Sequence, residues 1–585
     1  MQHLCQYLPC KYLSALLLPC VLVGAAIAQS VPTEPGSAMP ADWLAVSASG
    51  PWVVEVQFPD RAAARALEQQ LDVWYVDPRE PTLEALISAD DHRHLVGQGF
   101  TVRLDEPKTR ALARLGVPIA GQGGGIPGFP CYRTVGETYA TAAAIAADHP
   151  DLAAWIDIGD SWEKTQDPGQ GWDLRVLRLT QSAVSGPKPV FFASFAIHAR
   201  EYTTAELGTR FAEFLVDRYD VDPDITWLLD YHEVHLLLQA NPDGRVQAEG
   251  GVLWRKNTNN AYCSNTSNRG VDLNRNFEFE WNCCGGSSGS QCSTVYRGPT
   301  AASEPEIQAL QDYVKSIFPD QRGPGLDDPA PDDATGVAID VHSSGQLVLW
   351  PWGIDSDPTP NGTAFATLGR KLAFFNDSLP LPISDFTLAD GSSADFFYGE
   401  LGIAGFGYEL GTQFFESCTE FETNVLPGNL DSLTYAAQVA RTPYLTPAGP
   451  EAFDAAVPPG QVSAGDLVLL TATLDDTRFN QSNGTESTQT VAAAQAFIDH
   501  PPWDDAAVPI AMAASDGTFD EGVEAVEVMI DTTGLTPGRH ILFVQGFDTN
   551  DQAGVVAAAF LEVRAGFFDD DFESGTTAAW SAVVP

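Results

Sequence analysis

The chain has 585 residues, of which 44% are hydrophobic and 19% are charged, and 78 acidic against 31 basic side chains give a formal net charge of −47. This length predicts about three or four folded units, and the composition excludes a disordered, collagen-like or coiled-coil chain. Because the negative charge repels phosphate backbones and anionic lipids, we expect no nucleic-acid partner.

Residues 1–28 have the pattern of a cleavable signal peptide. Lys11 precedes an apolar stretch at residues 12–27, which is followed by a cleavage site of the small-residue type, Ala26-Ile27-Ala28. We therefore expect export to the extracellular space or the periplasm. No later apolar run is long enough to cross a bilayer, so no membrane span is expected.

Six of the nine cysteines lie beyond residue 28. An even number of cysteines in an exported protein predicts disulfide bonds, although the sequence does not determine which cysteines pair. Cys283, Cys284 and Cys292 lie in a loop rich in glycine and serine that contains no histidine. This composition favours a disulfide-bonded surface loop over a zinc knuckle.

Residues 29–120 are predicted to form a small α+β domain. Strand-like patterns at 52–58 and 73–76 flank a helical pattern at 61–71. The following glycine-rich residues 121–130 predict a linker between domains.

Residues 131–446 have the pattern of an α/β domain. Apolar strands such as 190–197 and 337–341 alternate with helical segments, which predicts a mostly buried sheet. In residues 447–565, short strands rich in Val, Leu and Thr predict an immunoglobulin-like β-sandwich. Residues 566–585 are short and acidic, and predict a C-terminal tail.

Three side chains at predicted strand ends suggest a metal site. His198-Ala-Arg-Glu201 follows the strand at 190–197, and a histidine and a glutamate three residues apart in one turn can bind the same cation. His342 follows the strand at 337–341 and offers a third ligand. Two histidines and one carboxylate leave a fourth position for water, as in catalytic zinc sites. Glu409 ends another apolar strand, where an acidic group must be paired or functional.

In this order, the motifs resemble those of the zinc carboxypeptidases of the carboxypeptidase A family, over residues 132–442. Further motifs that carry the resemblance are Asn241-Pro-Asp-Gly244, Trp254-Arg-Lys-Asn257, Gly270-Val-Asp-Leu-Asn-Arg-Asn-Phe277 and Gly391-Ser-Ser-Ala-Asp395. The resemblance implies an α/β fold with a mixed central sheet flanked by helices.

The resemblance also implies the roles of the catalytic residues. His198, Glu201 and His342 match the ligands of one catalytic zinc ion, and Asp272 matches the carboxylate that orients the first histidine. Glu409 matches the general base, which takes a proton from water and passes it to the leaving amine.

Four further residues match groups that bind the substrate or stabilise the transition state. Arg255 matches the arginine that stabilises the oxyanion. Asn274 and Arg275 match the pair that binds the free terminal carboxylate, with Arg200 assisting in the same groove. A fixed cation for a terminal carboxylate favours an exopeptidase over an endopeptidase.

One position departs from the family pattern, and a second one faces the specificity pocket in the family. The family's mobile tyrosine lies eight residues before the aspartate matched by Asp395, and Thr387 occupies that position here. The residue before Asp395 carries an acid in members that prefer Lys or Arg, and here it is Ala394. We therefore expect release of neutral or apolar residues, with selection of basic residues by Asp390 or another acid as the alternative.

The flanking domains resemble accessory parts of exported enzymes. Residues 29–120 resemble the propeptides of secreted family members, which implies an inhibitor or folding aid that is removed near the linker, or else a permanently attached adaptor. The β-sandwich resembles accessory modules of exported bacterial hydrolases, and its ligand is not predicted.

The resemblance implies an exported zinc metallocarboxypeptidase that acts on peptides or proteins with a free C-terminal carboxylate. One alternative is a peptidase for non-standard peptides such as those of cell walls. Another is a binding or adhesion protein with a silent catalytic domain. The Asn274 and Arg275 pair favours an ordinary carboxylate, and the complete set of zinc and base residues argues against a silent domain.

Overall fold

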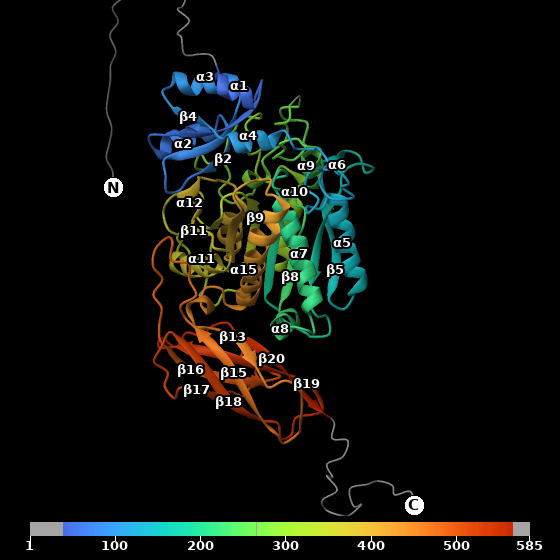
Figure 1. Cartoon of the computed structure of the whole chain (residues 1–585), viewed down its shortest axis with the longest axis vertical. Coiled ribbons are helices and arrows are strands. Elements are labelled where there is room, and N and C mark those ends of the chain that lie inside the picture. Colours follow the sequence, from blue (N-terminus) through green and yellow to red (C-terminus); the bar gives the residue numbers. More distant parts are fainter. Residues whose placement is uncertain (1–38, 265, 565–585) are drawn as a thin grey trace, which may run out of the picture.

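The computed structural model describes residues 39–264 and 266–564 (Figure 1). An N-terminal domain, a central α/β domain and a C-terminal β-sandwich follow one another along the long axis of the molecule. The predicted signal peptide at 1–28 and the predicted tail at 566–585 lie outside the described residues. Within the described ranges, no helix is both long and apolar enough to cross a membrane.

The N-terminal domain is an antiparallel sheet covered by short helices. Its strand order is β2-β3-β1-β4. In chain order its elements are α1 (Ala41–Val46), β1 (Trp52–Gln57), α2 (Arg61–Glu68), β2 (Asp72–Val76), β3 (Thr82–Ile87), α3 (Ala89–Gly97), β4 (Thr101–Leu104) and α4 (Glu106–Leu112). The predicted strands at 52–58 and 73–76 are present as β1 and β2, whereas β3 and α3 were not predicted.

An eight-stranded mixed sheet forms the centre of the α/β domain, as the resemblance implied. Its order is β11-β10-β12-β9-β7-β8-β6-β5. The strands are β5 (Ala153–Asp160), β6 (Asp173–Leu179), β7 (Val190–Phe195), β8 (Glu233–Leu237), β9 (Val337–Ser343), β10 (Leu347–Trp350), β11 (Leu379–Pro382) and β12 (Ala404–Leu410). The neighbours β12, β9, β7 and β8 run parallel, so their carboxyl ends lie at one edge of the sheet.

Helices cover both faces of this sheet. They are α5 (Val135–Asp148), α6 (Trp162–Gln166), α7 (Tyr202–Arg218), α8 (Pro223–Tyr231), α9 (Pro242–Glu249), α10 (Pro305–Ile317), α11 (Gly362–Asn376), α12 (Ile383–Phe386), α13 (Ser393–Leu401), α14 (Cys418–Glu420) and α15 (Leu426–Gln438). Phe191 of β7 contacts Phe211 of α7, and the next residue, Phe192, contacts Phe397 of α13. Alternate side chains of β7 are therefore buried on opposite faces, which explains its continuous apolar sequence.

The C-terminal domain is a curled sheet of eight strands that encloses its own core. The strands are β13 (Glu451–Ala456), β14 (Gln461–Ser463), β15 (Leu467–Asp475), β16 (Val491–Ile498), β17 (Ile510–Ala514), β18 (Val523–Asp531), β19 (Gly538–Asp548) and β20 (Ala557–Arg564). Because β17 pairs with both β16 and β18, it joins the two halves of the sandwich. Phe543 and Val555 of this domain belong to the same buried apolar cluster as Trp227 of α8, so the domain packs firmly on the α/β domain.

The six cysteines at and beyond residue 131 form three disulfide bonds. Cys131 pairs with Cys418, Cys263 with Cys292, and Cys283 with its neighbour Cys284. The bond between Cys131 and Cys418 ties the start of the α/β domain to α14. The structure thus supplies a connectivity that the sequence left open.

Candidate active site

The predicted site residues lie at the carboxyl edge of the parallel strands. His198 and Glu201 occupy the turn between β7 and α7, and His342 lies near the end of β9. Glu409 of β12 is paired in register with His342. Ligand sites in open α/β sheets form at such strand ends, because neighbouring parallel strands deliver their following residues to one place.

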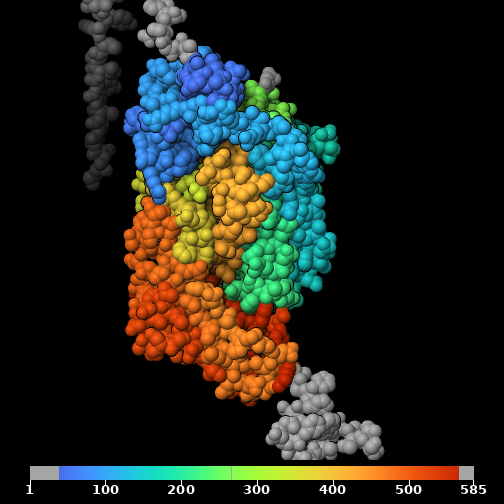
Figure 2. Space-filling model, viewed as in Figure 1, coloured from blue at the N-terminus to red at the C-terminus, as the bar shows by residue number. Residues whose placement is uncertain are grey.

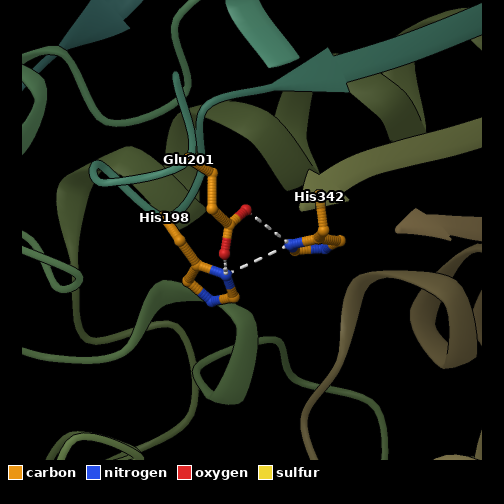
Figure 3. Close-up of side chains that lie close together, drawn as sticks. All are labelled: His198, Glu201 and His342. Carbon is orange, nitrogen blue, oxygen red and sulfur yellow. Dashed lines mark hydrogen bonds and ion pairs between the residues drawn. The ribbon is translucent and has the colours of Figure 1, made fainter. Parts of the chain in front are cut away.

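Three of these side chains converge on a common point (Figure 3). The Nδ1 atom of His198 lies 2.8 Å from Oε1 of Glu201, and the Nδ1 atom of His342 lies 3.4 Å from Oε2 of the same carboxylate. The two Nδ1 atoms are 3.1 Å apart. Bonds of about 2.0–2.1 Å to a tetrahedral zinc ion would place two nitrogen ligands at a similar separation. The three side chains therefore fit one zinc ion in both spacing and donor chemistry.

The second nitrogen of each histidine ring faces a buried aspartate. Nε2 of His198 lies 3.1 Å from Oδ1 of Asp272, and Nε2 of His342 lies 2.9 Å from Oδ2 of Asp340. A carboxylate at Nε2 keeps the proton on that nitrogen and leaves the Nδ1 lone pair for a metal ion. Asp340 was not among the predicted site residues, although its spacing of two residues from His342 on a strand places both on one face.

 Asp272 holds the guanidinium group of Arg255 beside the carboxylate of Glu201. The Nη2 and Nε atoms of Arg255 donate to Oδ2 of Asp272 at 3.0 and 3.3 Å, and its Nη1 lies 4.0 Å from Oε1 of Glu201. Burial disfavours the charged form of Arg255, but the negative charges of Asp272 and Glu201 outweigh the effect of burial and raise the pKa of Arg255. This arginine therefore keeps a fixed positive charge at the edge of the metal site.

Asn274 and Arg275 lie on the wall of the same cavity. Nε of Arg275 donates to the carbonyl oxygen of Gly286 at 2.8 Å, and its Nη1 donates to that of Asn274 at 2.7 Å. The side-chain amide of Asn274 accepts a bond from the backbone N–H of Ser393 and lies 3.0 Å from Nε2 of His342. The structure thus brings the predicted carboxylate-binding pair within reach of the metal site.

Glu409 lines the cavity together with the three metal-site residues. Burial raises the pKa of Glu409 to about 8. The neighbouring His342 and Arg255 oppose this shift, and the negative charge of Glu201 adds to it. A carboxyl group that both gains and loses a proton near neutral pH is suited to general acid and base catalysis.

An apolar wall completes the cavity. It is formed by Leu349, Ile383, Ala389 and Ala394. Asp390 does not line the cavity: its Oδ2 accepts hydrogen bonds from the backbone N–H groups of Cys284, Gly285 and Gly286. This carboxylate therefore fixes the loop that carries the disulfide between Cys283 and Cys284.

The N-terminal domain reaches into this cavity, and Figure 2 shows it seated directly on the α/β domain. Glu68 of α2 and Trp74 and Tyr75 of β2 line the cavity with the metal-site residues. Oε1 of Glu68 accepts a hydrogen bond of 2.6 Å from Thr387, the residue at the position of the family's tyrosine. Arg200 does not line the cavity, because Asp72 covers its guanidinium group.

Comparisons with known proteins agree with this geometry. The sequence profile of the zinc carboxypeptidase family matches residues 138–424. Carboxypeptidase A1 of Rattus norvegicus is 28% identical over 48% of this chain and 63% of its own length. A zinc carboxypeptidase of Saccharothrix mutabilis subsp. capreolus is also 28% identical, over 48% of this chain and 62% of its own length. The chain thus spans less than two thirds of these relatives.

The fold is also that of a solved carboxypeptidase. The crystal structure of carboxypeptidase A from Helicoverpa armigera superimposes with a TM-score of 0.55 at 21% identity, covering 66% of this chain and 98% of that one. At this identity the likeness concerns the fold alone. The family match, the histidine and glutamate residues at the strand ends and this likeness in fold agree with one another. Residues 138–424 therefore form a domain of the zinc carboxypeptidase family.

Proposed function

We propose that the chain is a zinc-dependent carboxypeptidase that releases the last residue of peptides or proteins with a free C-terminal carboxylate. The observation that carries this proposal is the single cavity in which His198, Glu201 and His342 lie beside Glu409. A metal site, a proton carrier and fixed cations in one cavity are the parts that metal-assisted hydrolysis requires.

Each residue has a defined task in this reaction. Zinc, when bound, supplies Lewis acidity that polarises a carbonyl group and lowers the pKa of water. Glu409 accepts the proton of the attacking water and later donates it to the leaving amine. Arg255, held by Asp272, faces the negative charge that develops on the carbonyl oxygen, and a preorganised charge of this kind contributes about 3 kcal/mol.

Substrate recognition follows from the remaining walls of the cavity. The guanidinium of Arg275 is fixed by two backbone carbonyl groups, so it can bind a carboxylate without further ordering. The apolar wall that includes Ile383 and Ala394 favours a neutral or apolar C-terminal side chain. We propose this preference on the chemistry of that wall.

The N-terminal domain is proposed to be a removable inhibitor. Its Asp72 binds Arg200 of the α/β domain. Its Tyr75 lies in the cavity where a substrate would bind, with its ring 5.7 Å from that of Phe386. Substrate and N-terminal domain would compete for this cavity. The signal-like sequence at 1–28 further supports export of the chain.

Removal of the N-terminal domain by limited proteolysis, followed by zinc loading, tests the proposal. We expect release of the last residue of a free-acid peptide such as one ending in Phe or Leu, and we expect a zinc chelator to stop it. The absence of release by zinc-loaded, processed protein would overturn the proposal and favour a cell-wall peptidase or a binding protein.

A further inference from the structure

We propose that Asp340 is a positioning residue of the metal site, which holds His342 in its ligating orientation and links it to the substrate pocket through Ser393. The inference rests on the proposed zinc site. Asp340 lies within β9, two residues before His342, and is 0% exposed. A carboxylate that is fully buried in the centre of a sheet requires partners, because burial without them is costly.

Asp340 has three such partners, which come from three elements. Its Oδ1 accepts a hydrogen bond of 2.7 Å from Ser194 of β7. Its Oδ2 accepts one of 2.6 Å from Ser393, the first residue of α13, and lies 2.9 Å from Nε2 of His342. Both oxygen atoms are therefore fixed, and one of them is aimed at the histidine nitrogen that faces away from the other metal-site residues.

The two histidines of the site are supported differently. Asp272 holds His198 but shares its charge with Arg255, whose Nη2 donates to Oδ2 of Asp272 at 3.0 Å. The partners of Asp340 apart from His342 are hydroxyl groups, which are neutral. No cation among these partners therefore offsets the negative charge that Asp340 directs at His342.

Ser393 connects Asp340 with residues of the proposed substrate pocket. Its backbone N–H donates to Oδ1 of Asn274 at 2.8 Å, while its hydroxyl group donates to Asp340. The next residue, Ala394, belongs to the apolar wall of the cavity. One carboxylate thus connects the orientation of a metal ligand with the start of the helix that forms the pocket wall.

Zinc affinity of the full-length chain tests this role without an activity assay. We expect Asp340→Asn, which keeps the shape but removes the charge, to raise the zinc Kd by about 10–100-fold in competition with a chelator. The visible spectrum of the cobalt-substituted protein should change in parallel, because the orientation of His342 changes.

Ser194→Ala is the matched control. It removes one hydrogen bond to Asp340 and leaves the contact with His342 in place. If Asp340 were only structural, both variants would lose zinc affinity in proportion to their loss of Tm. If Asp340 positions His342, Ser194→Ala should lower Tm but bind zinc nearly as the unmodified chain does. Unchanged zinc affinity and cobalt spectrum in Asp340→Asn would overturn the inference. Failure of the unmodified chain to bind zinc would instead overturn the proposed function itself.

Discussion

Asp72 of the N-terminal domain forms a two-pronged ion pair with Arg200 of the α/β domain. Nη1 of Arg200 lies 2.7 Å from Oδ2 of Asp72, and Nη2 lies 2.9 Å from Oδ1. The side chain of Arg200 is 1% exposed, and its guanidinium carbon lies 4.6 Å from the centre of the Phe414 ring. A charge-assisted pair of this geometry is strong, and here it joins two separately folded units.

Replacement of Asp72 should therefore weaken the inhibition that we propose. Loss of a hydrogen-bonded charge costs about 1.5–3 kcal/mol, so the activity of the unprocessed Asp72→Asn chain should rise by about tenfold or more. The measurement is the rate of peptide hydrolysis by a sample of the chain that mass spectrometry shows to be unprocessed. Glu80→Gln changes an exposed acid of the same domain and should have no effect. Equal latency of the Asp72→Asn and unmodified chains would contradict the proposed contact.

Replacement of Glu409 separates catalysis from metal binding. Glu409→Gln keeps the size of the side chain but cannot accept a proton, so kcat should fall by about 100- to 10,000-fold. Zinc content should stay that of the unmodified chain, because Glu409 is not among the three side chains that converge on the metal site. Metal analysis beside steady-state kinetics checks both points. Loss of zinc in this variant would show that Glu409 has a different role.

Charge introduced at Ala394 should change the preferred C-terminal residue. Ala394 is buried in the apolar wall, so a carboxylate there needs a cationic partner. In Ala394→Asp, kcat/KM for peptides ending in Lys or Arg should rise by about 100-fold relative to those ending in Leu or Phe. Ala394→Asn has the same shape without the charge and should show no such reversal. A reversal in both variants would assign the effect to size instead.

Stability should depend on pH through Asp224 at the boundary with the C-terminal domain. Its Oδ1 accepts bonds from Ala558 and Trp227, and burial raises the pKa of Asp224 to about 7, although both bonds oppose the shift. The unfolded chain has a pKa of about 4 at this residue. Between these values the unfolded state loses the proton first, so the contribution of Asp224 to stability is present below about pH 4 and is lost as the pH rises to about 7.

Asp224→Asn removes this titration but retains an acceptor for both hydrogen bonds. The Tm of the variant minus that of the unmodified chain should therefore increase between pH 4 and pH 7, by an amount equivalent to at most about 4 kcal/mol. Thermal denaturation at several pH values checks this. A difference that is constant with pH, or that falls, would contradict the shifted pKa.

Local motifs made much of the site predictable. His198 and Glu201 lie in one turn, and His342 and Glu409 end apolar strands, so hydrophobic pattern and spacing placed all four at the edge of a sheet. Asp340 was not recognised, because one of its partners, Ser393, lies 53 residues away and belongs to a different element. Such a contact has no signal in the local pattern.

Contacts between domains were equally hidden. Asp72 and Arg200 are separated by 128 positions, and only the packed structure brings them together. Within the N-terminal domain, β3 was missed because Ala85 and Glu84 are residues that strands disfavour, and burial against the domain's core outweighs that preference. The predicted mixed sheet flanked by helices was confirmed, since its apolar strands have the strongest pattern in the chain.

Recognition of the free C-terminus is the central claim, and one comparison tests it most directly. Processed, zinc-loaded protein is given pairs of peptides that differ only in a C-terminal carboxylate or amide, with and without a zinc chelator. We predict release of the last residue from the free acids alone, and complete loss of that release with the chelator. Equal cleavage of acids and amides would contradict carboxylate binding by Arg275, and cleavage that persists without zinc would contradict the metal site.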